Sequence, residues 1–248
     1  MQMVDTLDHD LFTRPLYGYA EADRLAGVPR GTSSRWVKGY KYRNDWGERV
    51  TQPPMTSGAE DKTEGGVSFF DLISIKAIDS LRELGFSTQK IREVVRYCRE
   101  ELGVAYPFAT RRFKTDRYRI YMRAGDGHLL EVLGGQKGAQ AWDEILDQFL
   151  KDLEYQNELA RRWWPLGIED QRVVVDPDYG FGLPVITGSG VRTETIAEQI
   201  QAGDTVEEVE SNQNFDAPPE FAPIVKTSID KHCTHPVFRP LFRMTRVT

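Results

Sequence analysis

The stretch YAEADRLAGVPRGTSSRWVKGYKYR (residues 19–43) predicts two short helices separated by a tight turn. Apolar residues recur at helical spacing over 20–26, and Gly27 follows at the point where a turn between two helices requires a positive φ. A second, basic helix is predicted over 31–40, with Trp36 as its anchor. This order of elements is typical of a helix-turn-helix, and it predicts that the chain binds DNA.

A second stretch, SFFDLISIKAIDSLRELGFSTQKIREVV (residues 68–95), predicts two amphipathic helices. Ser68 or Asp71 caps the first of them and Gly85 ends it, while Ser87 is a suitable N-cap for the second. Because the two helices are joined tightly, we expect them to pack as an antiparallel pair beneath the helix-turn-helix.

The intervening and following segments predict a wing, a hairpin and a connecting helix. YKYR at 40–43 predicts the first strand of a wing, and the aperiodic loop 51–66 predicts its tip. Alternating apolar residues over 113–133, around a Gly-Asp-Gly turn, predict a β-hairpin. Apolar residues at helical spacing then predict a helix over 139–162, which the sequence WWP at 163–165 ends.

The rear of the chain predicts a second small module over 172–232. Two strands are expected to pair around the turn DPDYGFGL, and a helix is expected over 195–202. Thr205 and Glu208 have the spacing of a capping box for the next helix. A last helix is predicted near 221–229.

Charge is unevenly distributed along the 248 residues, whose net charge is −6. Residues 1–123 contain 21 Lys and Arg against 17 Asp and Glu, whereas residues 124–248 contain 11 against 21. The split favours different partners for the two halves. The sequence has no apolar run of membrane-spanning length and no secretory signal, and its distant Cys98 and Cys233 predict reduced thiols in a cytoplasmic protein.

The basic helix and the strand after it contain the candidate DNA-binding residues. Arginine can form paired hydrogen bonds with guanine in the major groove, and hydroxyl and lysine side chains reach phosphates or base edges. A solvated helix in an unrelated bundle is the alternative, but the glycine turn and the helices over 68–95 favour DNA binding. The candidate DNA-binding residues are Arg30, Thr32, Ser33, Ser34, Arg35, Lys38, Tyr40, Lys41 and Arg43, with Arg49 as a further phosphate contact.

Residues 17–102 resemble the DNA-binding domain of the MerR family of bacterial regulators. YAEADRLAGVPRGTSSRW resembles the opening helix-turn-helix of that family, and the stretch at 68–95 is similar to its later helices. MerR regulators usually have an Arg-Tyr pair in the recognition helix, and Arg35-Trp36 stand at the matching positions. Ser33 departs from the leucine common in that helix, and the hairpin at 113–133 stands where the family's long dimerising helix would follow. The resemblance implies a winged helix-turn-helix.

The segment GLPVITGSGVRTETIAEQIQAGDTVEEVESN resembles a short bacterial domain written GKPVIRGTRI and followed by two helices, described as a predicted antitoxin domain. It departs from that pattern at 188–191, where Gly-Ser-Gly-Val replaces Gly-Thr-Arg-Ile. The two modules together are similar to VapB-type antitoxins of actinobacteria, which partner a PIN-domain ribonuclease. The matching residues are Gly182, Pro184, Ile186, Gly188, Ile196, Gly203 and Glu208.

This resemblance implies a toxin-binding region, and the C-terminal tail from Lys231 to Thr248 is the candidate. An arginine inserted among the carboxylates around the magnesium ion of a PIN nuclease would neutralise them and occlude the metal. A tail that packs on its own domain is the alternative. The candidate toxin-binding residues are Phe238, Arg239, Phe242, Arg243 and Arg246.

We expect no catalytic site, cofactor or metal. His232, Cys233 and His235 stand close together but lack a fourth ligand for zinc. Glu207 and Glu208 stand in a first helical turn, where negative charge favours the helix dipole. The sequence contains no Ser-His-Asp order, no Walker loop and no GxGxxG after a strand.

The sequence therefore predicts a mainly α protein with small β-hairpins, in which a MerR-like winged helix-turn-helix is joined to a second small helix-turn-helix-like module. The expected domains are the winged helix at 16–104, the hairpin with its connecting helix at 105–165, the antitoxin-type module at 172–232 and the tail at 233–248. The expected function is that of a homodimeric, DNA-binding antitoxin and autorepressor that neutralises a PIN-domain ribonuclease. Two alternatives stay open: a one-component MerR-like regulator with a small-molecule effector, and a protein-interaction adaptor that does not bind DNA.

Overall fold

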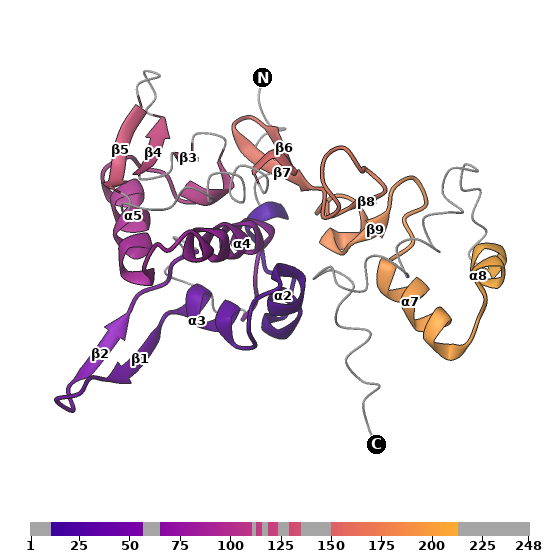
Figure 1. Ribbon diagram of the computed structural model, residues 1–248, viewed down its shortest axis with the longest axis horizontal. Helices are drawn as coiled ribbons and strands as arrows, with labels where there is room; N and C mark the ends of the chain where they lie inside the picture. Colours follow the sequence, from indigo (N-terminus) through magenta and orange to yellow (C-terminus); the bar gives the residue numbers. More distant parts are fainter. Residues whose placement is uncertain are drawn as a thin grey trace. The chain divides into compact units, whose positions relative to one another are not determined.

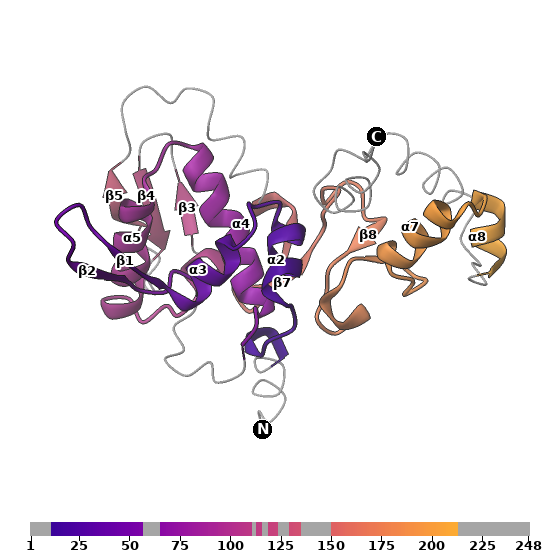
Figure 2. The ribbon, with the colours of Figure 1, turned by 90° about the horizontal axis from the view of Figure 1, so that it is seen from below.

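The structure is a computed structural model that describes residues 11–56, 65–110, 113–115, 119–123, 129–134 and 150–212. For residues 113–115, 119–123 and 129–134, and for Val206, Glu207 and Glu210, it describes the backbone alone. The chain divides into two compact units, Met1–Arg161 (unit 1) and Arg162–Thr248 (unit 2), and each is described by itself (Figure 1 and Figure 2). No helix in the described ranges is long and apolar enough to cross a membrane.

Helices α2 (Tyr19–Ala26) and α3 (Thr32–Lys38) form the pair of short helices that the first stretch predicts. Gly27 follows α2 with a left-handed φ of 75°, which confirms the predicted turn. The N–H groups of Gly27 and Val28 donate to carbonyls in the last turn of α2, at 3.2 and 3.0 Å. The end of α2 is therefore satisfied by hydrogen bonds as the chain turns toward α3, in the manner of a Schellman cap.

A hairpin follows α3 at the place predicted for the wing. Strand β1 (Tyr40–Arg43) pairs antiparallel with β2 (Arg49–Gln52), so the hairpin's tip is 44–48 and the predicted tip at 51–66 is wrong. The tip forms where it does because Oδ1 of Asn44 accepts hydrogen bonds from the backbone N–H groups of the second and fourth residues after it, at 3.1 and 2.9 Å. An Asn side chain that binds its own following backbone closes a turn locally.

The second stretch forms helices α4 (Phe69–Glu83) and α5 (Thr88–Glu100). Ser68 is the N-cap of α4 and forms a capping box with Asp71, in which each side chain accepts a hydrogen bond from the other's backbone N–H. Ser87 caps α5 by accepting a hydrogen bond from the N–H three residues later, at 3.3 Å. The predicted caps of both helices are confirmed.

Helix α4 is the centre of unit 1, because its apolar residues lie on all sides of the helix. It contacts α2, α3, α5 and the 3-10 helix η1 (Pro107–Ala109). It runs across α5, as Figure 1 shows, and so the prediction of an antiparallel pair is wrong. Since α4 must also cover α2, α3 and η1, only part of its length is left for α5. Its buried apolar residues are Phe69, Phe70, Leu72, Ile73, Ile75, Ala77, Ile78 and Leu81.

Three strands follow the helices of unit 1. They are β3 (Phe113–Thr115), β4 (Arg119–Arg123) and β5 (Leu129–Gly134), and they form an antiparallel sheet in that order. The hairpin predicted over 113–133 is confirmed by β4 and β5, and β3 adds a strand beside β4.

Residues 153–163 form a hairpin where the sequence predicts a helix. Strand β6 (Leu153–Gln156) pairs with β7 (Leu159–Trp163), so the helix predicted over 139–162 is wrong from Leu153 onwards, while 139–149 lie outside the described residues. Asn157 and Glu158 form the turn, with left-handed φ values of 49° and 68°. A two-residue turn of this kind matches the twist of paired strands, but Asn-Glu is a weaker sequence signal than Asn-Gly.

Unit 2 has a strand pair followed by two helices. Strands β8 (Val173–Val174) and β9 (Val185–Ile186) pair antiparallel on either side of the 3-10 turn η2 (Gly180–Gly182), as predicted for the strands around DPDYGFGL. Helices α7 (Thr193–Ala202) and α8 (Val206–Asn212) then confirm the helix predicted at 195–202 and its successor. The mainly α fold with small β-hairpins is confirmed.

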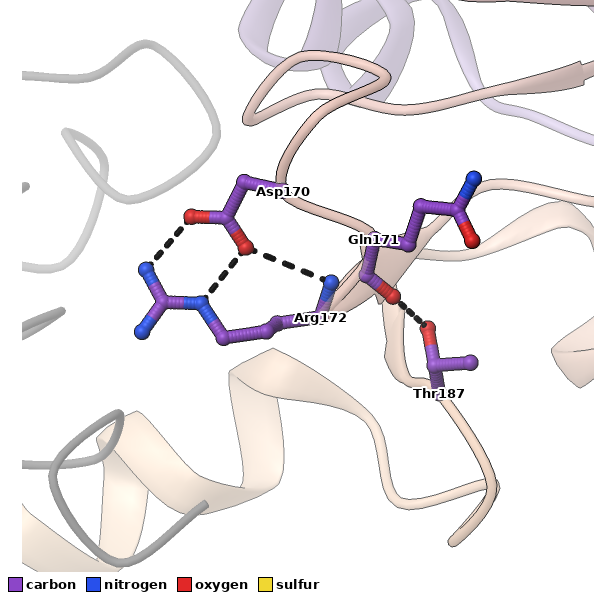
Figure 3. A network of polar contacts seen from close by, with 4 residues as sticks. All are labelled: Asp170, Gln171, Arg172 and Thr187. Carbon is purple, nitrogen blue, oxygen red and sulfur yellow. Dashed lines mark hydrogen bonds and ion pairs between the residues drawn. The ribbon is translucent and has the colours of Figure 1, made fainter. Parts of the chain in front are cut away.

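Local polar contacts support this small unit. Arg172 pairs with the carboxylate of Asp170 through two hydrogen bonds of 2.5 Å, and Thr187 donates to the carbonyl of Gln171 at 2.6 Å, just before β8 begins (Figure 3). The capping box of Thr205 with Glu208 is present. The core that these contacts surround consists of Val173, Ile186, Ile196 and Val209, with Leu166, Val191 and Ile200 packed against it.

Replacing Glu158 by glycine is expected to stabilise the β6–β7 hairpin. Glu158 is exposed and has a left-handed φ. This conformation is sterically unfavourable for a residue with a Cβ atom but not for glycine. We expect the free energy of unfolding to rise by about 0.5–1 kcal/mol, measured by urea denaturation. The control is Glu169→Gly at an exposed position without a positive φ, which is expected to lower stability. Equal effects of the two substitutions would contradict the assigned turn.

Candidate nucleic-acid interface

Helix α3 and the turn before it present basic side chains to solvent. Arg30, Arg35 and Lys38 are exposed, and Ser34 is half-buried. Thr32 and Ser33 have exposures of 3% and 0%, so these two predicted DNA-binding residues do not reach the surface. They line the side of α3 that packs inward, where their small size lets the first turn of α3 approach α2 closely.

Asp23 of α2 fixes the start of α3. Its side chain is buried, and its two carboxylate oxygens accept hydrogen bonds from the N–H groups of Gly31 and Ser33, at 2.5 and 2.7 Å. The N-cap residue of α3 is Gly31, which has no side chain that could cap the helix. A carboxylate at this position also faces the positive end of the helix dipole. Sequence reasoning missed Asp23, because the helix that its carboxylate caps begins nine residues later in the chain.

Helix α4 supports the other end of α2. Lys76 donates a hydrogen bond to the carbonyl of Ala26, at 3.3 Å, where the last turn of α2 leaves carbonyls without helical partners. Burial lowers the pKa of Lys76, while the neighbouring carboxylates of Asp79 and Glu83 act in the opposite direction. The end of α2 and the start of α3, on either side of the turn, are thus each held by a charged side chain bound to backbone groups.

The register of the β1–β2 hairpin gathers its basic residues on one face. Arg43 lies directly opposite Arg49, and Lys41 lies two residues before Arg43. Because side chains alternate along a strand, these three residues share one face, while Tyr40 and Tyr42 share the other. Like charges directly opposite each other on neighbouring strands are destabilising. This face of the hairpin is therefore suited to an anionic partner, which would relieve the repulsion.

The tyrosine face of the hairpin turns toward α5. The guanidinium of Arg92 in α5 lies 5.5 Å from the centroid of the Tyr40 ring, and the Tyr40 and Tyr42 rings lie 6.0 Å apart. The basic face must then point away from α5. Both views show α3 beside the hairpin (Figure 1 and Figure 2), and α3 buries its other side against α2 and α4. The exposed cations of α3 and of the hairpin therefore point away from the same helical layer.

Close backbone contacts hold the hairpin against α3. A Cβ atom at Gly39 would lie 2.3 Å from the carbonyl oxygen of Gln52. The backbone before β1 and the end of β2 are therefore so close that only glycine fits at position 39. The N–H of Met55 donates to the carbonyl of Trp36 at 2.7 Å, and both side chains are buried. The prediction that Trp36 anchors α3 is confirmed. Hairpin and helix thus keep a fixed relation to each other.

The cations of this surface lack acidic partners within the part of the chain that the structure describes. Lys38 lies over the Tyr19 ring at 4.4 Å, Arg35 donates to the carbonyl of Gly31, and Arg43 donates to the carbonyl of Gly47. These partners are neutral and leave the positive charges uncompensated. No ion pair to a described carboxylate is found for Arg30, Arg35, Lys38, Lys41, Arg43 or Arg49.

Trp46 at the tip of the hairpin is a second residue that sequence reasoning missed. Its side chain is 84% exposed, and the N–H of Trp46 is fixed by Asn44. A turn such as Asn-Asp-Trp-Gly places its central side chains outward. The turn sequence could therefore have predicted that Trp46 is exposed. An exposed aromatic ring beside basic residues is suited to contact with the sugars or bases of a nucleic acid.

The other predicted sites lie in residues that the structure does not describe. These are the tail residues Phe238, Arg239, Phe242, Arg243 and Arg246, and the His232, Cys233 and His235 cluster. Within the described ranges, no three His, Cys, Asp or Glu side chains are grouped as metal ligands.

Two family models match the parts of the chain that the structure separates. Residues 15–95 match the family described as "Putative DNA-binding HTH domain", and residues 173–213 match "Protein of unknown function (DUF433)". The first match covers α2, α3, α4 and the first part of α5, and shows that unit 1 contains a helix-turn-helix domain. The second covers β8, β9, α7 and α8.

Curated relatives resemble the chain over most of its length. It is 27% identical over 210 residues to a Mycobacterium tuberculosis protein named "Putative antitoxin VapB45", which covers 80% of this chain and 87% of the relative. It is 24% identical over 219 residues to "Uncharacterized protein Rv2308" of the same organism, covering 80% and 84%. The crystal structure of Rv2018 from Mycobacterium tuberculosis shares the fold, with a TM-score of 0.53, 20% identity, and coverage of 87% of this chain and 99% of that one.

Removing the Asp23 carboxylate is expected to loosen α3. Asp23→Ala leaves two backbone N–H groups at the start of α3 without an acceptor, which should lower the free energy of unfolding by about 1–3 kcal/mol in urea denaturation. Asp23→Asn, which keeps one oxygen acceptor, should lose less. Glu21→Ala removes a carboxylate that forms a partly exposed ion pair on the same helix and should change stability by less than about 0.5 kcal/mol. If Asp23→Ala is as stable as Glu21→Ala, Asp23 does not fix α3.

Proposed function

We propose that this chain is a sequence-specific DNA-binding antitoxin and autorepressor, and that it neutralises a PIN-domain ribonuclease in a bacterial cytoplasm. The observation that carries the proposal is the surface formed by the exposed cations of α3 and the β1–β2 hairpin. These cations face away from one helical layer, lack described carboxylate partners and are held in a fixed relation. A surface of this kind is suited to the phosphate backbone of duplex DNA.

In this proposal α3 lies in the major groove. Arg35, exposed at the middle of α3, reads a base edge, and Arg30 and Lys38 lie at the two ends of the helix. Lys41, Arg43 and Arg49 bind phosphates beside the groove. Ser34 is a half-buried contact at the margin. Tyr40, which lies on the hairpin face toward α5, and the buried Thr32 and Ser33 take no part.

The antitoxin part of the proposal is supported by the relatives. One relative that aligns with 80% of the chain is named an antitoxin, and the helix-turn-helix match adds a DNA-binding role. The C-terminal tail, with its alternating aromatic and arginine residues, is the proposed toxin-binding segment. Its arginines would enter the carboxylate cluster of the nuclease, neutralise the carboxylates and occlude the metal.

We propose further that the chain works as a homodimer. One recognition helix reads too few base pairs for useful affinity, and two-fold related helices read a palindromic operator. The sequence offers two sources for the two-fold contact, the helix predicted at 139–162 and the rear module, and residues 153–163 form the β6–β7 hairpin instead of that helix. Unit 2 is therefore the preferred source of that contact.

Replacing Arg35 by alanine is expected to weaken binding to the chain's own promoter. If Arg35 binds a base, the loss is about 1–3 kcal/mol, or roughly 5- to 150-fold in Kd, and discrimination at that base pair is relaxed. The measurement is fluorescence anisotropy with a labelled promoter duplex at fixed salt. Arg192→Ala, which removes an exposed arginine from unit 2, is the matched control and should bind as the wild type does. Equal affinity of all three proteins would remove Arg35 from the interface.

Truncation at Lys231 is expected to abolish toxin neutralisation and to leave DNA binding intact. The reason is that the proposed toxin-binding residues follow this point, whereas α3 and the hairpin lie far before it. Neutralisation is measured as loss of ribonuclease activity of the partner, and DNA binding by anisotropy as above. A truncated chain that still inhibits the nuclease would show that the tail is not the inhibitory segment.

A further inference from the structure

The turn η2 in unit 2 exposes an aromatic side chain in an unfavourable backbone conformation. Phe181 is 73% exposed, with φ 57° and ψ 31°. Its neighbours Gly180 and Gly182 also have left-handed φ values, of 67° and 75°. Glycine adopts this conformation freely, but a bulky residue that does so is an outlier, at a cost of about 1–2 kcal/mol.

Contacts beneath Phe181 hold the turn firmly. A Cβ atom at Gly180 would lie 2.4 Å from a methyl group of Val185, so the turn packs directly on β9. The N–H of Gly182 donates to the carbonyl of Asp176 at 3.1 Å. The Asp176 carboxylate is itself buried, accepting from the N–H of Asp178 at 2.9 Å and from Nε of Arg162 at 2.6 Å. Phe181 is therefore displayed by a rigid support.

Phe181 gains no burial that would offset its strained conformation. The small apolar cluster beneath it consists of Trp164, Val174 and Val185 with Tyr179 packed against it. Phe181 stays outside this cluster, although a glycine at its position would remove the strain. An observed backbone outlier at an exposed aromatic residue points to a role in binding.

The described part of unit 2, which contains this aromatic residue, is acidic. Residues 162–212 contain ten Asp and Glu against three Lys and Arg. Two of those arginines, Arg162 and Arg172, are paired with aspartates of the same unit. This excess negative charge in the described part of unit 2 favours a positively charged partner.

We propose that Phe181 is the anchor by which unit 2 docks onto a basic protein, inserting its ring into an apolar pocket rimmed by cations. This inference rests on the proposed function, because a ribonuclease that binds RNA must carry a cationic surface. It assigns to unit 2 a part of the toxin contact separate from the tail. Rigidly held aromatic residues are typical anchors of protein interfaces, because they bind with little loss of conformational entropy.

The test compares full-length variants in their affinity for the nuclease encoded by the adjacent reading frame, measured by calorimetry. Phe181→Gly and Phe181→Ala are expected to bind about thirty-fold more weakly or worse, as for an interface hot spot. Phe181→Gly should also keep or raise the melting temperature, because glycine relieves the left-handed strain; a residue with a merely structural role would lower it. Tyr97→Ala removes a partly exposed aromatic residue of α5 and should bind as the wild type does.

The outcomes separate this inference from the proposed function. If the wild type binds the nuclease and Phe181→Gly binds it equally well, the docking role is wrong and the antitoxin function stands. If the wild type does not bind the nuclease, the proposed function fails, and the assignment of this partner fails with it. If Phe181→Gly changes the oligomeric state and leaves nuclease affinity unchanged, Phe181 belongs to a contact between copies of the chain, which also overturns the inference.

Discussion

The hydrogen bonds from the Asp23 carboxylate to the first backbone N–H groups of α3 are the constraint on which the DNA-facing surface depends. A helix of seven residues is too short to be stable by itself, so its direction must be imposed by its neighbours. Asp23 imposes it at one end, and buried Trp36, bonded to Met55, imposes it at the other. The exposed Arg35 and Lys38 of α3 take their positions from these internal contacts.

The β1–β2 hairpin extends this surface, and its exposed cations are also positioned by backbone contacts. Gly39 permits the close approach of its two strands, and the register then sets Arg43 against Arg49. Such a pair is unfavourable in isolation, as is the left-handed Phe181 of unit 2. In the proposals made above, phosphates bound to unit 1 would relieve the repulsion between these arginines. A basic protein bound to unit 2 would offset the strain at Phe181 by burying its ring.

Features with a local cause could be predicted from the sequence. The turn at Gly27 and the caps at Ser68, Ser87 and Thr205 follow from the chemistry of one or two side chains, and the structure has each of them. The basic residues exposed on α3 also follow from residue type and periodicity. The buried Ser33 does not, because its burial depends on how closely α3 approaches α2.

Features with a non-local cause could not be predicted. Asp23 caps a helix that begins nine residues later, and no local sequence pattern predicts such a hydrogen bond. A helix was predicted where the β6–β7 hairpin forms, because the apolar residues at 153–162 also fit helical spacing. The chain forms the hairpin instead, with Asn157 and Glu158 in its turn. Helices α4 and α5 cross because α4 must cover several elements at once, which is a property of the assembled unit.

The most direct test of a cationic groove-binding surface is the salt dependence of promoter binding. Each phosphate contact contributes about 0.9 to the slope of log affinity against log salt concentration. We expect a steep negative slope for the wild type, and a slope shallower by about 2 to 3 for the triple variant Lys41→Gln, Arg43→Gln and Arg49→Gln. Equal slopes for the two proteins, or an affinity that salt does not change, would contradict the assignment of this surface to DNA.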